Sequence, residues 1–322
     1  MVDVLVIPDG AAEPVGDGPT SLERARMPAL AELCRAGAVT RVRTIPPGLP
    51  AGSEVGVPAL LGWVPAGPVD RGALEAAAAA VAPGPCERAW RCDVLGPDGE
   101  RATEDEAAAA AAAMAARLPA HRVIPLRGHR LLVFGRLRPT AASLGTGLSL
   151  WPEGLVPPRI LGSETVVVAA PGAAAGCARL MGATALTPIG ATGGVDTDLG
   201  AKARAALAAI AAGAARVAVH VGAPDEAAHA RDAAAKVAAL ERIDRELIAP
   251  LAEAVARAGG RIAVCPDHGC DPADGRHDAA PVPAVLAGRG VAPAGPEVFS
   301  ERAVADLAVE APAWAAPLGA AA

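Results

Sequence analysis

The sequence predicts an α/β fold, in which a mainly parallel sheet is flanked by helices and a smaller α+β domain is inserted. Short runs rich in Val and Ile, typical of buried strands, recur along the chain. Longer stretches of helical composition separate most of these runs. Residues 68–160 break this alternation, which indicates a domain of a different kind.

Five apolar runs are expected to form the strands of the parallel sheet. Each run is short and β-branched, as is typical of a strand that is buried on both faces. In chain order the predicted strands are "VDVLVI" (2–7), "VTRVRTI" (39–45), "TVVVAA" (165–170), "RVAVHV" (216–221) and "RIAVC" (261–265).

Helices are expected over residues 22–36 and 201–213, and the clearest helical pattern covers about residues 226–257. In that segment Lys236 and other charged residues are expected on the polar face, and a Gly-Gly pair at 259–260 ends the helix. The apolar positions recur at steps of three or four: Val237, Leu240, Ile243, Leu247, Leu251 and Val255.

An inserted substrate cap is expected over residues 68–160, so that the core comprises 1–67 and 161–322. The cap lacks the strand and helix alternation of the core. It contains a turn at 96–100, an alanine-rich helix at 103–117, one strand at 130–135 and a Gly/Pro-rich stretch that runs to Pro158.

The composition is typical of a soluble globular protein and argues against a nucleic-acid binder. Of the 322 residues 52% are hydrophobic and 20% are charged, and the net charge is -6. Nucleic-acid binding needs a basic surface that neutralises phosphates, and the chain has no basic stripe. The first apolar run stops at Pro8, which is too short for export or a membrane span, so a cytoplasmic location is expected.

The six cysteines indicate neither a disulfide framework nor a zinc ribbon, because they are scattered and form no C-x-x-C pair. We therefore expect them to act as small buried apolar residues. They are Cys34, Cys86, Cys92, Cys177, Cys265 and Cys270.

Carboxylates and histidines follow three of the predicted strands. Asp9 follows the first, Asp225 lies four residues after the fourth, and Asp267 and His268 follow the fifth. In open α/β sheets ligands gather outside the carboxyl ends of the strands, so these side chains are expected at one edge. A further histidine, His277, lies in the loop beyond them.

Each of these motifs has a simpler alternative. Asp225 and His229 are spaced i, i+4 and can grip one ion, but an Asp at the start of a helix is also a common N-cap. A loop histidine such as His277 is more often exposed or hydrogen-bonded than metal-bound. Ser53, in "PPGLPAGSEVG", can bind phosphate at a helix N-terminus or act as a plain N-cap.

Together the motifs resemble the archaeal-type cofactor-independent phosphoglycerate mutases, a family of the alkaline phosphatase superfamily. The resemblance covers nearly the whole chain and is strongest after residue 190. The matching segments are "IPDG" at Asp9, "PAGSEVGVPALLGW" at Ser53, "DRGALEAA" (70–77), "WRCD" (90–93), "GATGGVDTDLGAKARAAL" (190–207), "HVGAPDEAAHARDAAAKVAALERID" (220–244), "PDHG" (266–269) and "RHDAAPVPAVL" (276–286).

This resemblance implies an alkaline-phosphatase-like core and metal-dependent phosphoryl transfer through a phosphoserine. The implied reaction interconverts 3-phosphoglycerate and 2-phosphoglycerate, a step of glycolysis, and the implied nucleophile is Ser53. Two divalent ions are implied, and mixed Asp, His and Ser ligands favour Mn²⁺ or Zn²⁺, with Mg²⁺ or Co²⁺ as alternatives. The implied ligands are Asp9, Ser53, Asp267 and His268 for one ion, and Asp225, His229 and His277 for the other.

The cap departs from the family pattern, which leaves the substrate open. The family carries paired arginines after the segment that corresponds to "WRCD", whereas only Arg101 is kept here. A phosphorylated acid needs several basic groups, although surface arginines usually have no such role. The candidates are Arg71, Arg91, Arg101, Arg130 and Arg136.

Two alternatives to the mutase stay open. The same metal site can serve a phosphatase, or a mutase or hydrolase of another small phosphorylated or phosphonate acid. The other alternative is a non-catalytic metal-binding or regulatory protein with this fold, although the complete ligand set argues against it. The expected partner is a small phosphorylated acid, and neither nucleic acid nor a membrane is expected.

Overall fold

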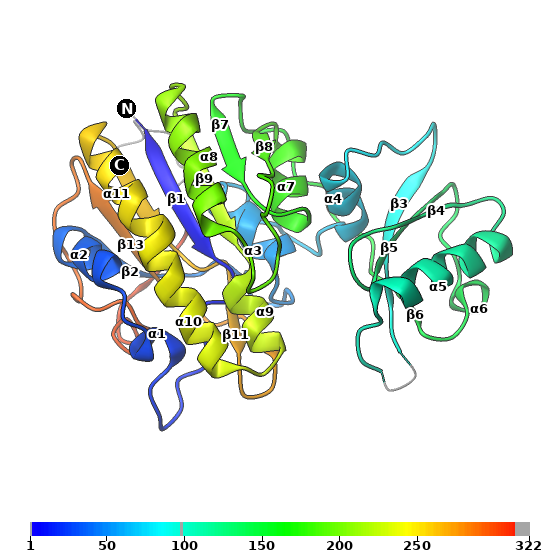
Figure 1. Cartoon of the computed structure of the whole chain (residues 1–322), viewed down its shortest axis with the longest axis horizontal. Helices are drawn as coiled ribbons and strands as arrows, with labels where there is room; N and C mark the ends of the chain where they lie inside the picture. The colour runs from blue at the N-terminus through cyan, green and yellow to red at the C-terminus, as the bar shows by residue number, and fades with distance from the viewer. Residues whose placement is uncertain (1, 97–98, 313–322) are drawn as a thin grey trace. The chain divides into compact units, whose positions relative to one another are not determined.

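The computed structural model describes residues 2–96 and 99–312, and the chain divides into two compact units (Figure 1). One unit comprises Met1–Ala66 with Pro157–Ala322, and the other comprises Gly67–Val156. The expected cap boundaries, after residues 67 and 160, differ from these by one and four residues. The second unit is therefore inserted between two parts of the first.

A sheet of eight strands forms the centre of the first unit, in the order β14-β2-β13-β10-β1-β9-β7-β8 among the described residues. From β10 to β8 every pair of neighbours is parallel, so the prediction of a mainly parallel sheet is confirmed. The expectation that 39–45 forms a parallel strand holds only for its pairing with β14, because β2 is antiparallel to β13. The strands are β1 (Asp3–Pro8), β2 (Ala38–Val42), β7 (Thr165–Val168), β8 (Thr184–Leu186), β9 (Arg216–Val221), β10 (Arg261–Val264), β13 (Val282–Gly288) and β14 (Val309–Glu310).

Helices pack against both faces of this sheet. On one face Val4 and Val6 of β1 meet the apolar sides of α2, α8, α10 and α11, and Figure 1 shows α10 and α11 crossing in front of the strands. Helices α3 and α7 contact each other, and α7 also packs against β7 and β8. The helices are α1 (Ser21–Arg24), α2 (Pro28–Ala36), α3 (Ser53–Leu60), α7 (Ala173–Met181), α8 (Leu199–Ala211), α9 (Ala223–His229), α10 (Ala233–Ile243), the π-helix η1 (Asp244–Ile248) and α11 (Ala249–Arg257).

The helix expected over 226–257 is broken near its start, so that prediction is wrong in its first turns. Arg231 has φ +55°, a left-handed conformation that ends α9, and Asp232 then caps α10 by accepting a hydrogen bond from Ala235 N. Lys236 was expected on the polar face, yet it is fully buried. Asp225 and His229 therefore lie on a short helix of their own rather than at the start of a long one.

The helix expected over 22–36 is also divided. Pro28 disfavours helical backbone at the residue before it, Met27, so the helix cannot run through this point. Helix α2 starts at Pro28 without a cap from its own chain segment. Instead the buried carboxylate of Asp244 accepts hydrogen bonds from Ala29 N (3.1 Å) and Leu30 N (2.8 Å). A residue distant in sequence thus satisfies the first N–H groups of α2.

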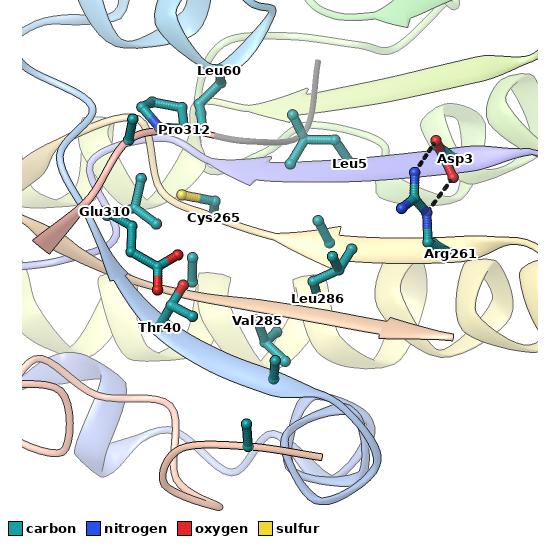
Figure 2. Close-up of a pocket in the computed structure, with 16 residues that line it drawn as sticks. Asp3, Leu5, Thr40, Leu60, Arg261, Cys265, Val285, Leu286, Glu310 and Pro312 are labelled. Carbon is teal, nitrogen blue, oxygen red and sulfur yellow. Dashed lines mark hydrogen bonds and ion pairs between the residues drawn. The ribbon is translucent and has the colours of Figure 1, made fainter. Parts of the chain in front are cut away.

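The other face of the sheet carries an apolar pocket of about 430 Å³ over β1, β2, β10 and β13 (Figure 2). Leu5, Cys265 and Leu286 are among its lining residues. At one end Arg261 donates to both carboxylate oxygens of Asp3, at 2.9 and 2.7 Å, so these two charges compensate each other. The lining contains no histidine, and the candidate site residues lie elsewhere.

The second unit is a four-stranded antiparallel sheet in the order β4-β5-β3-β6, with α5 packed on one face and α4 on the other. Only one of these strands was expected from the sequence, because the others are short or interrupted by charged residues. The helix expected at 103–117 is confirmed as α5. The elements are α4 (Arg71–Ala78), β3 (Arg88–Val94), α5 (Glu104–Arg117), β4 (Arg122–Pro125), β5 (Arg130–Gly135), α6 (Ala141–Leu144) and β6 (Leu148–Leu150).

Five of the six cysteines are buried, as expected, whereas Cys86 is exposed. Within residues 2–96 and 99–312 no helix is both long and apolar enough to span a membrane.

We expect Asp244→Ala to destabilise the first unit by about 1–2 kcal/mol, because it leaves one buried and one partly buried N–H group of α2 without an acceptor. Urea denaturation followed by circular dichroism measures the loss. Asp244→Asn is the matched control, since it keeps one acceptor oxygen and should lose less. Equal stability of Asp244→Ala and the wild type would show that the cap contributes nothing.

Candidate metal centre

Three parallel strands end at the same level and position the first candidate residues. In the register of β1 with β9, Ile7 is opposite His220 and Pro8 is opposite Val221, and Asp9 N donates to Val221 O at 3.0 Å. Strand β10 lies on the other side of β1. The residues that follow these strands therefore converge at one edge of the sheet.

Ser53 is the first residue of α3, and its hydroxyl faces this edge. Ser53 Oγ is 3.2 Å from both Oδ1 and Oδ2 of Asp9, to which it donates. The interpretation of Ser53 as a plain N-cap is wrong, because Gly52 occupies the N-cap position. Close packing of α3 requires glycine one turn later: a Cβ at Gly56 would lie 2.2 Å from Asp267 O.

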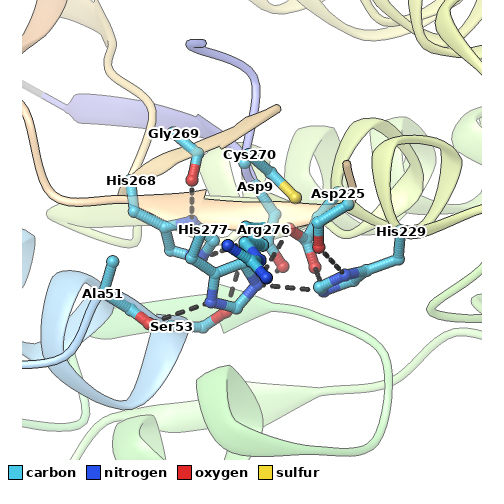
Figure 3. Close-up of polar contacts among 12 residues, drawn as sticks. Asp9, Ala51, Ser53, Asp225, His229, His268, Gly269, Cys270, Arg276 and His277 are labelled. Carbon is cyan, nitrogen blue, oxygen red and sulfur yellow. Dashed lines mark hydrogen bonds and ion pairs between the residues drawn. The ribbon is translucent and has the colours of Figure 1, made fainter. Parts of the chain in front are cut away.

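Helix α9 and a β-hairpin bring a second group together, as Figure 3 shows. The hairpin consists of β11 (Gly269–Asp271) and β12 (Arg276–Asp278). Asp225 Oδ2 lies 3.2 Å from His229 Nε2, and Asp225 Oδ1 lies 3.3 Å from His277 Nε2. The two Nε2 atoms are 2.9 Å apart. The i, i+4 spacing of Asp225 and His229 thus places both on one face of the helix.

Each of the three candidate histidines has its Nδ1 paired with a backbone carbonyl. His229 Nδ1 is 2.8 Å from Gly275 O, His268 Nδ1 is 3.0 Å from Gly269 O, and His277 Nδ1 is 2.9 Å from Ala51 O. If Nδ1–H donates to the carbonyl, the lone pair of a neutral imidazole is on Nε2 and points into the site. This arrangement is typical of histidines that bind a metal ion.

Several buried polar atoms of the site have no hydrogen-bond partner, and a cation would satisfy them. These atoms are Asp225 Oδ1, Asp267 Oδ2, His220 Nε2 and His268 Nε2. His268 Nε2 is only 3.1 Å from Asp9 Oδ1, yet the pair lacks hydrogen-bond geometry. An unpaired buried polar atom raises the free energy of the folded state. A divalent ion can be coordinated by several such oxygen and nitrogen atoms at once. The residues present therefore fit a metal centre.

The seven residues predicted as ligands or nucleophile lie together in the first unit. Asp9, Asp225 and His268 have ligand atoms within 4.8 Å of one another, as do Asp225, His229, Cys270 and His277. Ser53 joins the first set through Asp9. Asp267 accepts a hydrogen bond from Gly10 N at 3.3 Å and lies beside His268.

The buried carboxylates of the site are stabilised in their ionised form by nearby positive charge. Burial and the charge of Asp225 oppose ionisation of Asp9, but contacts with His220 and His268 bring its pKa below the usual range. Burial also opposes ionisation of Asp225, and His229 and His277 more than compensate, so its pKa is lowered.

His220 is a site residue that the sequence interpretation missed. Its Nε2 is 3.3 Å from Asp9 Oδ2 and 3.9 Å from Asp267 Oδ2, and the three residues form a further group with metal-ligand spacing. Burial lowers the pKa of His220, but Asp9 and Asp267 raise it to about 9. A histidine inside the apolar run 216–221 is the signal that could have indicated it.

Two fully buried lysines bond the backbone next to the site, and neither was assigned a role from the sequence. Lys202 Nζ donates to His220 O at 2.7 Å, and burial lowers its pKa to about 8 while Asp9 opposes that change. Lys236 Nζ donates to Ala12 O at 3.2 Å and Cys270 O at 2.6 Å. These bonds fix the backbone at His220 and Cys270.

The backbone after Asp9 is shaped by Gly10, which has φ +59°. A Cβ at this position would lie 2.5 Å from Asp225 Oδ1. Both the left-handed conformation and the close approach require glycine. The "PDG" turn therefore lets the carboxylates of Asp9 and Asp225 approach each other.

The five candidate arginines lie in the second unit, and two of them are bonded to carboxylates there. Arg91 is buried and pairs with Asp93 (2.8 Å) and Glu75 (3.2 Å), while Arg71 pairs with Glu75 at 3.1 Å. Both guanidinium groups also contact the ring of Trp151.

The other three candidate arginines differ in environment. Arg130 is partly buried and donates to Arg127 O at 3.1 Å, while Arg101 and Arg136 are exposed. The backbone of Arg101 forms an isolated antiparallel β-bridge with that of Leu95. Arg130 also interacts electrostatically with Glu75, the carboxylate that Arg71 and Arg91 bond.

Comparison with known proteins relates the chain to one family of metalloenzymes. A sequence model described as the metalloenzyme superfamily matches residues 1–319. A 2,3-bisphosphoglycerate-independent phosphoglycerate mutase of Methanothermobacter thermautotrophicus is 31% identical over 90% of both chains. A protein of the same name from Methanothrix thermoacetophila is 29% identical over 94% of both chains.

Two solved structures share the fold. A protein of Pyrococcus horikoshii has a TM-score of 0.75 and 25% identity, and the match covers 94% of this chain and 90% of that one. The cofactor-independent phosphoglycerate mutase of Thermoplasma acidophilum has a TM-score of 0.61 and 18% identity over 98% of both chains. The predicted core architecture is thereby confirmed.

We expect chelation of divalent ions to lower the melting temperature, because the buried carboxylates then repel one another and the orphaned atoms stay unpaired. An ion present at about 100 times its dissociation constant contributes about 2.7 kcal/mol. Calorimetry with EDTA, and then with excess Mn²⁺ or Zn²⁺, measures the change. Sodium chloride at equal ionic strength controls for screening. An unchanged melting temperature would contradict a metal centre here.

Proposed function

Because the chain belongs to the metalloenzyme superfamily, and within it to the archaeal-type cofactor-independent phosphoglycerate mutases, we propose that it catalyses metal-dependent phosphoryl transfer through a phosphoserine. The reaction we propose is the interconversion of 3-phosphoglycerate and 2-phosphoglycerate within one molecule. The observation that carries the proposal is the hydroxyl of Ser53, which lies 3.2 Å from Asp9 at the edge where two sets of metal-binding donors meet.

The two donor sets suit two divalent ions. Mixed oxygen and imidazole donors favour Mn²⁺ or Zn²⁺, with Mg²⁺ or Co²⁺ as alternatives. Bound ions would stabilise the charge of the phosphoryl oxygens and favour the ionised serine. We assign Asp9, Ser53, Asp267 and His268 to one ion, and Asp225, His229 and His277 to the other.

Ser53 acts as the nucleophile in the proposed mechanism. Its Oγ–H bond points to Asp9, which orients the hydroxyl. Ser53 Oγ loses its proton and forms a bond to phosphorus while the bond from phosphorus to the 3-oxygen of the substrate breaks, and the leaving oxygen takes up one proton, so that the step neither consumes nor releases protons overall. The phosphoserine lies at the N-terminus of α3, where backbone N–H groups and the helix dipole favour an anion.

The second displacement decides between a mutase and a phosphatase. In a mutase the 2-hydroxyl of the retained glycerate attacks the phosphoserine, loses its proton and restores the Ser53 hydroxyl. If water attacks instead, the products are free phosphate and glycerate. Retention of glycerate and exclusion of water are functions that we assign to the second unit as a substrate cap.

Substrate recognition is assigned to arginines of the cap. A guanidinium group pairs with carboxylate or phosphate through two parallel hydrogen bonds. Arg101 and Arg136 have exposed side chains and suit this role. Arg71, Arg91 and Arg130 are the remaining candidates, and we assign Arg91 a part in building the cap as well.

The cap also supports a second candidate function, in which the same site acts on another small phosphorylated or phosphonate acid. Arg71 and Arg91 both bond carboxylates within the cap, which reduces the positive charge available to glycerate. Hydrolysis of a different phosphorylated acid, or transfer of its phosphoryl group within the molecule, would use the same serine and ions.

We expect metal-loaded protein to convert 3-phosphoglycerate to 2-phosphoglycerate without added 2,3-bisphosphoglycerate and without release of phosphate. The physical reason is that the phosphoryl group is held on Ser53 between two displacements. Both products are followed in one assay, by coupled enolase and by phosphate detection. Phosphate without the isomer would support the second candidate, and no turnover would start a substrate screen.

We expect Ser53→Ala to lower phosphoryl transfer by at least about a thousandfold, because no hydroxyl remains to form the covalent intermediate. Steady-state turnover and phosphoserine detection by mass spectrometry test this. Ser163→Ala is the matched control, because Ser163 is exposed and lies outside the site. Turnover of Ser53→Ala at the wild-type rate would exclude the mechanism.

A further inference from the structure

Cys270 lies beside the metal-binding donors of α9 and the hairpin. In the hairpin register Cys270 is directly opposite His277. Side chains that are directly opposite in an antiparallel pair lie on the same face, with Cβ atoms about 4.5–5.5 Å apart. Figure 3 shows the sulfur of Cys270 next to Asp225 and on the side of the hairpin that carries His277. The thiol is fully buried.

The four side chains have the spacing of a tetrahedral site. The Sγ atom of Cys270 and one ligand atom each of Asp225, His229 and His277 all lie within 4.8 Å of one another. The Nε2 atoms of His229 and His277 are 2.9 Å apart, and each lies near a different oxygen of Asp225, at 3.2 Å from Oδ2 for His229 and 3.3 Å from Oδ1 for His277. Tetrahedral zinc with nitrogen and oxygen ligands at about 2.0–2.1 Å places them about 3.3 Å apart.

A separate observation indicates that these atoms face a cation. Asp225 Oδ1 is buried and has no hydrogen-bond partner among the described residues, and Asp225 itself is 8% exposed. If Nδ1 of His229 and His277 donates to the backbone carbonyls, both Nε2 atoms of the neutral rings carry lone pairs, and these atoms are 2.9 Å apart. Two lone pairs at that separation repel unless a cation or a proton lies between them.

We propose that Cys270 is the fourth protein ligand of the metal position formed by Asp225, His229 and His277, and that this position takes Zn²⁺ or Co²⁺ rather than Mn²⁺ or Mg²⁺. The inference rests on the proposed function for the presence of an ion at this position. A thiolate is a soft ligand that selects zinc over the hard ions. The thiol proton is released to solvent when the ion binds.

The backbone holds the thiol in place without help from an ion. Cys270 N donates to Ala12 O at 2.8 Å, and Lys236 Nζ donates to Cys270 O at 2.6 Å. Because Lys236 is fully buried and also bonds Glu13, this support is rigid. A ligand that is already oriented loses little entropy when the ion binds.

Among the residues that the structure describes, the other metal position has no sulfur ligand and is chemically harder. Its donors are the oxygens of Asp9, Ser53 and Asp267 and the imidazole of His268, with the imidazole of His220 nearby. Oxygen-rich sites suit Mn²⁺ and Mg²⁺. The two positions are therefore expected to select different ions, and only one of them can give a metal–thiolate bond.

The test is a titration of metal-free protein with Co²⁺, followed by absorption spectroscopy. The wild type is expected to show a near-ultraviolet thiolate-to-cobalt charge-transfer band that saturates at one Co²⁺ per chain, besides visible bands from both ions. Cys270→Ser is expected to lose the charge-transfer band and keep the visible bands. Cys86→Ser is the matched control, because this thiol is exposed, and it should keep the charge-transfer band.

A competition experiment gives a second readout. Loss of a metal-orienting group typically lowers affinity by about 10–100-fold, so loss of a direct thiolate should lower Zn²⁺ affinity by at least about 100-fold. Mn²⁺ affinity should change less than about tenfold, because manganese gains little from sulfur. Chelator competition on the wild type and Cys270→Ser measures both values. Equal losses for the two ions would overturn the selectivity.

The outcomes separate this inference from the proposed function. Visible cobalt bands without a charge-transfer band in the wild type would overturn the role of Cys270 and leave a metal centre intact. No cobalt binding at all would remove the metal centre and, with it, the proposed function. Because the wild-type spectrum decides, the result does not depend on how well Cys270→Ser folds.

Discussion

Three buried aspartates, Asp9, Asp225 and Asp267, converge at the carboxyl edge of the core sheet, and the structure around them compensates for their charge. Asp267 and Asp225 each have an oxygen without a hydrogen-bond partner. Carboxylates in a site of low dielectric repel one another strongly. Nearby imidazoles can supply part of the compensating positive charge, and divalent ions would add more at the same place. The charge of the site thus explains why so many histidines of the chain lie here.

The supporting structure consists of glycines and buried lysines. Gly10 and Gly56 allow backbone and carboxylates to approach to distances that any Cβ would block. Lys202 and Lys236 donate hydrogen bonds to the backbone carbonyls of His220 and Cys270, and the charge of Lys202 also interacts with Asp9. These glycines and lysines therefore hold the charged side chains of the first unit in a fixed geometry.

The second unit contains a polar network of its own, in which buried charges pair with one another. Arg91, Glu75 and Asp93 bond one another, and Trp151 Nε1 donates to Asp93 at 2.8 Å. Breaking one member leaves a buried charge unpaired, which is strongly destabilising.

The sequence by itself determined the mainly parallel core and several of the residues that meet at the strand ends, because periodicity and strand-end position are local properties. It did not determine the break at Arg231, the cap of α2 by Asp244 or the burial of Lys236, since these depend on contacts between distant segments. His220 and Cys270 were missed for the same reason. One looks like part of an apolar strand and the other like a small core residue, and only tertiary packing turns both toward the aspartates.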